Sequence, residues 1–227
     1  MQQYSWYRYA GVAGSISIIA LWLVGCGTLV TPAPSLQATA STAVVHPYPT
    51  PSGTQMLYSN ALTTPAAGWA SGPECRFTSN GLVVRPNGGQ AYICLAPTAA
   101  LADVSVAVTV QQTNGPLTHA YGIAFRHAAP KNYYFFGIDG KGCYTLTIVV
   151  NDISHTVIPF TANAAIHSGA NAVNRLQVIA RGNVITFLVN GSAVGQATLT
   201  TYASGTIGLR GINNGSVTFQ QLSIAKV

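Results

Sequence analysis

The sequence predicts an all-β sandwich of two stacked antiparallel sheets, and three observations support this fold class. Apolar and polar residues alternate with a period of two from about Met56 onward, as they do in half-buried strands. Gly, Asn and Pro residues separate these runs into short segments. No long segment of this region shows the 3.6-residue period of an amphipathic helix.

The expected strands follow one another with little chain between them. In chain order they span residues 82–85, 91–95, 104–112, 120–127, 132–138, 143–150, 155–160, 174–181, 184–190, 193–199, 205–210 and 216–225. Turns such as Asn190-Gly191 and Asn213-Asn214-Gly215 supply residues that tolerate a positive φ, which tight hairpins require. These elements make up one domain, residues 56–227.

Residues 1–25 are predicted to direct export, because residues 10–25 form an apolar run after the single cation Arg8. Leu23-Val24-Gly25-Cys26 resembles the bacterial lipobox, which implies lipidation of Cys26 and removal of a signal peptide. The alternative is an uncleaved apolar helix, since residues 9–30 carry no charge and about 20 residues span a bilayer. Both interpretations place the domain on the extracytoplasmic side of the cell membrane. The intact mass of the membrane-extracted protein distinguishes them.

Residues 27–55 are predicted to form a disordered stalk. This segment is rich in Pro, Thr and Ser and has no charged residue, so it cannot bury enough apolar surface to fold alone. The domain that follows therefore stands away from its membrane tether.

The charge of the chain argues against nucleic acid as a partner. The net charge of +6 comes from 10 basic residues against 4 acidic ones, and the basic residues are scattered singly. Nucleic-acid binding would need them gathered on one face. We expect a monomer with a weak attraction to anionic cell-surface polymers.

Three segments, at residues 121–146, 174–196 and 204–227, carry a family resemblance. They are similar to hairpins of concanavalin A-like lectin/glucanase domains, in particular the laminin G-like and 3-keto-disaccharide hydrolase-like branch. The most specific part is "ITFLVNG", a strand followed by an Asn-Gly turn. The resemblance implies a jelly-roll β-sandwich. It leaves function open, because that superfamily includes lectins, adhesion modules and hydrolases.

The remaining cysteines have separate expected roles. Cys75 and Cys94 flank two short strands and the Asn87-Gly88-Gly89 turn, and we predict a disulfide between them. Cys143 begins a strand in which alternation places it on the outer face, and we predict a free thiol there.

The acidic residues do not form a recognisable catalytic pair. Glycoside hydrolysis needs two carboxylates about 5–10 Å apart, and the chain has only Glu74, Asp103, Asp139 and Asp152. Asp139 and Asp152 stand at opposite ends of the 143–150 strand. We therefore predict no catalytic residues, no metal site and no cofactor. The laminin G-like resemblance implies one exception, calcium held by Asp103, Asp139 and Asp152.

One sheet face is the predicted binding surface. Strands 120–127, 132–138 and 143–150 put large apolar residues on one face, which must be the core. The opposite face carries rings, a guanidinium and hydroxyls suited to a sugar: Arg126, Tyr133, Phe135, Thr145 and Thr147. Alternatively, Tyr133 and Phe135 are cross-strand partners covered by a loop.

We therefore expect a membrane-tethered recognition module that binds glycan or cell-envelope polysaccharide without turnover. One alternative is a structural or sensory surface domain with no small ligand. The other is a sugar hydrolase of the 3-keto-disaccharide hydrolase-like type.

Overall fold

The structure, a computed structural model, describes residues 55–69, 72–86 and 91–227. The predicted export segment, the lipidation site Cys26 and nearly all of the predicted stalk lie outside these residues. All the regular elements of the described part are strands, and this part holds no helix long and apolar enough to cross a membrane.

Sheet A has eight strands in the order β12-β11-β10-β5-β14-β3-β2, with β1 beside β14. Both β1 and β3 pair with the edge of β14 that faces away from β5. The strands are β1 (Gln55–Asn60), β2 (Cys75–Thr78), β3 (Gly81–Val84), β5 (Val104–Asn114), β10 (Val173–Arg181), β11 (Val184–Val189), β12 (Ser192–Thr198) and β14 (Ser216–Lys226).

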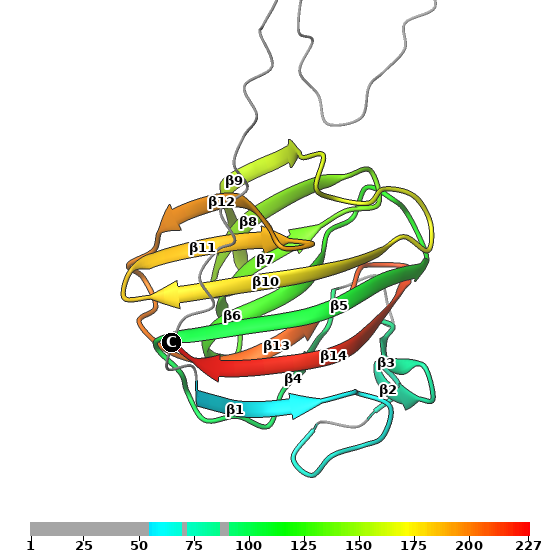
Figure 1. Cartoon of the computed structure of the whole chain (residues 1–227), viewed down its shortest axis with the longest axis horizontal. Coiled ribbons are helices and arrows are strands. Elements are labelled where there is room, and N and C mark those ends of the chain that lie inside the picture. The colour runs from blue at the N-terminus through cyan, green and yellow to red at the C-terminus, as the bar shows by residue number, and fades with distance from the viewer. Residues whose placement is uncertain (1–54, 70–71, 87–90) are drawn as a thin grey trace, which may run out of the picture.

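Sheet B has six strands in the order β4-β13-β6-β7-β8-β9 and stacks behind sheet A (Figure 1). Its pairings are all antiparallel. The strands are β4 (Ile93–Leu95), β6 (Tyr121–Ala129), β7 (Asn132–Ile138), β8 (Cys143–Val150), β9 (Ile153–Ala162) and β13 (Thr206–Arg210).

This architecture confirms the predicted fold class, and each of the twelve predicted strands overlaps a strand of the structure. Sequence reasoning missed β1 and β2. β1 has no buried residue to produce an alternation, and β2 is four residues long, so neither gives a periodic signal. Both become strands through pairing: β1 joins β14, and β2 joins β3.

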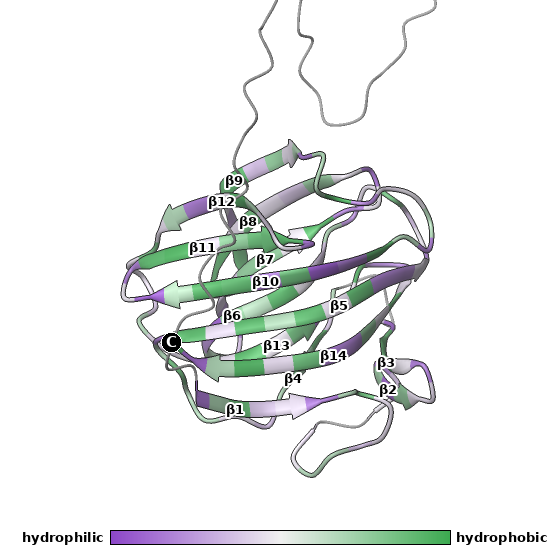
Figure 2. Cartoon of the chain, in the orientation of Figure 1, coloured by the Kyte–Doolittle hydropathy of each residue, from purple (hydrophilic) through white to green (hydrophobic). Residues whose placement is uncertain are grey.

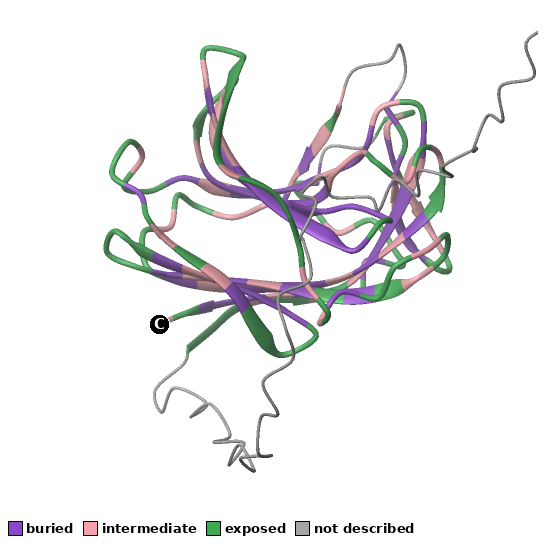
Figure 3. Cartoon of the chain, turned by 90° about the horizontal axis from the view of Figure 1, so that it is seen from above, coloured by how far each residue is buried: buried purple, intermediate pink, exposed green. Residues whose placement is uncertain are grey.

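The core lies between the two sheets and is built from the alternating apolar residues of both. Figure 2 shows hydrophobic residues recurring along the strands, and Figure 3 shows buried residues on both layers. Phe187 of sheet A joins the layers, because its ring stacks on Phe136 of sheet B at 4.8 Å and lies 6.2 Å from Phe125. Such aromatic contacts add to the stabilisation from burial.

Two bulges change which residues face this core. In β14 the pairing shifts around Gln221, whose φ is 51°, so that Phe219 and Leu222 are both buried in the core. In β6 the pairing shifts after Phe125, and the next residue, Arg126, has a φ of 46°. A bulge adds one residue to a strand and therefore reverses the alternation beyond it.

The buried Tyr121 makes the fold sensitive to alkaline pH. Burial, with a smaller contribution from Asp139, raises the pKa of Tyr121 from 10.0 to about 12. The Tyr121 hydroxyl loses its proton at a lower pH in the unfolded state than in the folded state, because only the folded state buries it. The stability that depends on the neutral phenol is therefore complete below pH 10 and is lost as the pH rises to about 12. We expect the free energy of unfolding to fall by about 2–3 kcal/mol across this window.

Urea unfolding at about pH 9 and about pH 12 measures this loss. Tyr121→Phe cannot ionise, so the variant should lose about 2–3 kcal/mol less than the wild type between the two pH values. An equal loss in the variant would contradict the assignment to Tyr121.

Candidate binding site

A pocket of about 370 Å³ lies on the outer face of sheet B. Four strands contribute to its lining, with Phe135 of β7, Thr145 and Thr147 of β8, Ser154, Thr156 and Phe160 of β9, and Arg210 of β13. Thr118, His119 and Asn213 close it from the loops that precede β6 and follow β13. Its size falls in the range of small-molecule sites.

Two of the lining residues, Arg210 and Phe135, form a stacked pair. The Arg210 Cζ lies 4.2 Å from the centre of the Phe135 ring, a cation–π contact. Gly137 makes this packing possible, since a Cβ there would overlap the ring of Phe135. Phe135 is only 1% exposed, so its ring holds the guanidinium in place and is not a free surface for a sugar.

Hydroxyls line the wall that β8 and β9 form. Thr145 is buried and donates its hydroxyl hydrogen to the Ile158 carbonyl at 2.8 Å, which leaves the oxygen able to accept. Ser154 and Thr156 are exposed on the neighbouring strand. Phe160 is 44% exposed and is an aromatic surface that a ligand can reach.

The pocket thus contains three of the five residues predicted as ligand-binding, namely Phe135, Thr145 and Thr147. Tyr133 lies beside it. Its half-buried ring stacks on His127 with the ring centres 5.6 Å apart. Burial raises the pKa of the Tyr133 hydroxyl, and the nearby Arg210 charge opposes this shift.

Arg126 does not lie on the outer face, which corrects the sequence prediction. The side chain is 1% exposed and points between the sheets, because the β6 bulge turns both Phe125 and Arg126 inward. Its guanidinium donates to the carbonyls of Tyr202 at 3.1 Å, Ala102 at 3.2 Å and Gly182. Burial lowers the pKa of Arg126, and the neighbouring Tyr134 and Asp103 oppose the shift. Arg126 therefore has a structural role, tying together three loops.

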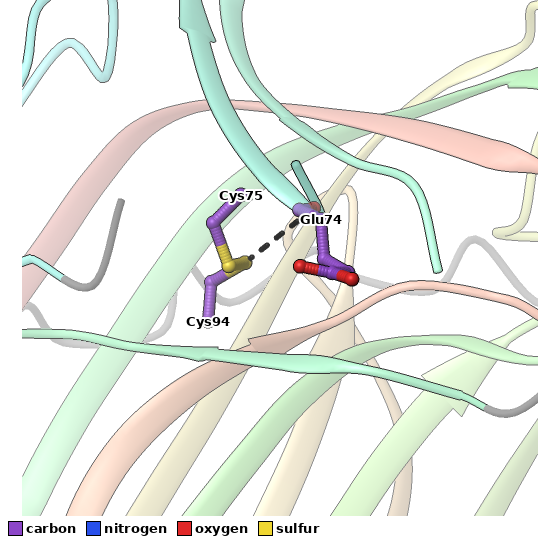
Figure 4. Close-up of a disulfide and its surroundings, with 3 residues drawn as sticks. All are labelled: Glu74, Cys75 and Cys94. Carbon is purple, nitrogen blue, oxygen red and sulfur yellow. Dashed lines mark hydrogen bonds between the residues drawn. A yellow bond between two sulfur atoms is a disulfide. The ribbon is translucent and has the colours of Figure 1, made fainter. Parts of the chain in front are cut away.

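The cysteines agree with one prediction and contradict another. The predicted disulfide between Cys75 and Cys94 is present, and the Cys94 sulfur lies 4.0 Å from the Glu74 carbonyl oxygen (Figure 4). Cys143 is fully buried, and no cysteine of the described residues is free. The prediction of an exposed free thiol at Cys143 was wrong on both counts, because alternation assigns a residue to a face of its strand but does not show what packs on that face or what the residue contacts.

Each of the three aspartates named as calcium ligands makes a hydrogen bond or an ion pair within the protein. Asp103 accepts from the Gly182 amide at 2.8 Å, and Asp152 pairs with Lys131 at 2.8 Å. Asp139 is buried and accepts from the Lys141 and Cys143 amides, while burial raises the pKa of its carboxyl. The described residues hold no group of three or more acids, histidines or cysteines placed to bind a metal.

Sequence reasoning missed Arg210, whose guanidinium lines the pocket. The alternation in "TIGLR" does place Gly208 and Arg210 on the face opposite the buried Ile207 and Leu209. That signal could have assigned Arg210 to an outer face. The pairing of β13 with β6, which brings it beside Phe135, is visible only in the tertiary structure.

Comparison with known proteins supports the fold through structures alone. No protein-family model matches the chain. No curated protein matches it either.

Solved structures do match. The carbohydrate-binding module CBM66 of Bacillus subtilis has a TM-score of 0.56 and 18% identity, covering 76% of this chain and 94% of the module. A B. subtilis protein of unknown function with a galectin-like fold has a TM-score of 0.59 and 14% identity, covering 76% and 97%. A putative glycosyl hydrolase of Parabacteroides distasonis has a TM-score of 0.53 and 11% identity, covering 75% and 100%. At such identities these neighbours show the fold only, a β-sandwich like the one described above.

Proposed function

We propose that this protein is a recognition module that binds glycan in the pocket on sheet B without turnover. The observation that carries the proposal is the lining of that pocket, in which an exposed aromatic ring, several hydroxyls and a guanidinium converge. Aromatic rings stack on the C–H faces of sugars, and hydroxyls and guanidinium groups bond to sugar hydroxyls. The fold neighbours include a carbohydrate-binding module, which agrees with this function.

Binding is favoured over hydrolysis by the distribution of the acids. Among the described residues, the four carboxylates of Glu74, Asp103, Asp139 and Asp152 are all absent from the pocket lining. A glycosidase needs two carboxylates on either side of the scissile bond. The pocket residues can therefore hold a sugar but offer no acid and base pair of this kind.

We also propose that the module is tethered to the cell membrane and faces the extracytoplasmic side. The lipobox-like Leu23-Val24-Gly25-Cys26 and the uncharged Pro-rich segment after it support this location. The disulfide between Cys75 and Cys94 agrees with an oxidising compartment.

A glycan array, probed with and without calcium, tests the function and supplies a ligand. Titration calorimetry with the best ligand then compares the wild type with Phe160→Ala. Because Phe160 is exposed in the pocket, its loss should weaken binding about tenfold without affecting folding. Val157→Ala is the matched control, since Val157 is 42% exposed on the same strand and does not line the pocket.

The expected result is weaker binding by Phe160→Ala and wild-type affinity for Val157→Ala. The proposal fails if no glycan binds, or if both variants bind the ligand as tightly as the wild type does.

A further inference from the structure

Among the described residues, no acidic side chain pairs with the Arg210 guanidinium. None of the residues that line the pocket is Asp or Glu. Asp152 is the acid that acts electrostatically on Tyr133, the neighbour of Arg210. This carboxylate is already paired with Lys131, in the one ion pair of the described residues. The positive charge of Arg210 is therefore left without a countercharge among the residues that the structure describes.

The packing of Arg210 keeps this charge at the pocket. Phe135 lies under the guanidinium, and the adjacent Tyr133 hydroxyl interacts with it. The Arg210 Nε is buried and has no hydrogen-bond partner among the described residues. Burial lowers the pKa of the group, which means that desolvation opposes the charge at this place. A buried charge of this kind is compensated when a ligand brings an anion to it.

Carboxylates are the anions that best match this group. A guanidinium is planar and can donate two parallel N–H bonds to the two oxygens of a carboxylate. The rest of the pocket, with Thr145, Thr147, Thr156 and Phe160, is neutral and suited to a sugar ring and its hydroxyls. The net charge of +6 on the chain also favours the approach of an anionic polymer.

We propose that the pocket selects an acidic sugar, a uronic acid residue whose carboxylate pairs with Arg210. This inference rests on the proposed glycan-binding function and names the class of sugar. The ring of the sugar lies toward Phe160, and its hydroxyls meet the threonines of β8 and β9.

The test compares oligogalacturonate with neutral galacto-oligosaccharide of the same length by titration calorimetry. The wild type should bind oligogalacturonate at least about tenfold more tightly. Raising NaCl from about 50 to about 500 mM should weaken binding of the acidic ligand more than that of the neutral one. This salt comparison uses only the wild type, so it does not depend on how any variant folds.

Arg210→Gln removes the charge and should reduce the affinity for oligogalacturonate to that for the neutral sugar. Arg210→Lys keeps the charge but loses the fork geometry, so it should retain part of the preference. Circular dichroism of both variants checks the fold.

A fully sulfated oligosaccharide is the third ligand, and it should bind more weakly than oligogalacturonate.

The outcomes separate the two proposals. If neutral sugar binds as tightly as oligogalacturonate, with no added effect of salt, the acidic-sugar inference is wrong while glycan binding stands. Tighter binding of the sulfated ligand would overturn the assignment to a carboxylate. If no sugar of any kind binds, the proposed function itself fails.

Discussion

Arg126→Ala should lower the free energy of unfolding by about 3–5 kcal/mol, the range for breaking a buried polar network. The substitution leaves the carbonyls of Ala102, Gly182 and Tyr202 without their donor and opens a cavity between the sheets. Urea unfolding measures the loss. Arg181→Ala is the matched control, since Arg181 is exposed next to Gly182 and should change stability by less than about 0.5 kcal/mol.

The same experiment separates a structural role for Arg126 from the ligand-binding role that the alternation suggested. Arg126→Lys keeps a charge but cannot serve three acceptors in one plane, so its loss should be smaller than that of the alanine variant. If it remains folded, it should bind glycan with wild-type affinity, because Arg126 does not line the pocket. A wild-type unfolding midpoint for Arg126→Ala would show that the three loops do not depend on this side chain.

Removal of the disulfide should cost about 3 kcal/mol, as expected for a cross-link between residues 19 apart. β2 and β4 are edge strands of sheets A and B, so the bond between Cys75 and Cys94 joins the two layers at one margin. Both cysteines are buried, and alanine replaces them without adding a polar group.

Urea unfolding of Cys75→Ala, Cys94→Ala and the double variant measures this contribution. One bond is lost in each case, so the double variant should be about as unstable as either single variant. A double loss equal to the sum of the two single losses would contradict a shared stabilising bond.

Much of the fold could be predicted because the signals are local. Alternation depends only on neighbouring residues in a strand, so it located the elements of sheet B and the inward residues such as Tyr134 and Phe136. The same alternation placed Phe135, Thr145 and Thr147 on the outer face, where they line the pocket. Asn-Gly turns marked hairpins such as the one between β11 and β12.

The failures have a common cause, which is a dependence on partners distant in sequence. The alternation rule assigned Arg126 to the outer face, but a bulge in β6 reversed the pattern after Phe125. No alternation marked β1, which is a strand because it pairs with β14, the last strand in the sequence.

The amino-acid sequence alone predicted the two-sheet sandwich and the outward face of β7 and β8, because both follow from the short-range alternation of residue types. It also predicted the Cys75–Cys94 bond, from the positions of the two cysteines on either side of two short strands and a turn, although in the structure this bond joins the two sheets. Strand order and bulges were settled only by the packed structure. The pairing of β13 with β6 placed Arg210 over Phe135, and the β6 bulge turned Arg126 into the interior. The physical reason is that strand pairing is a long-range choice, made by the combined packing of both sheets and not by any one segment.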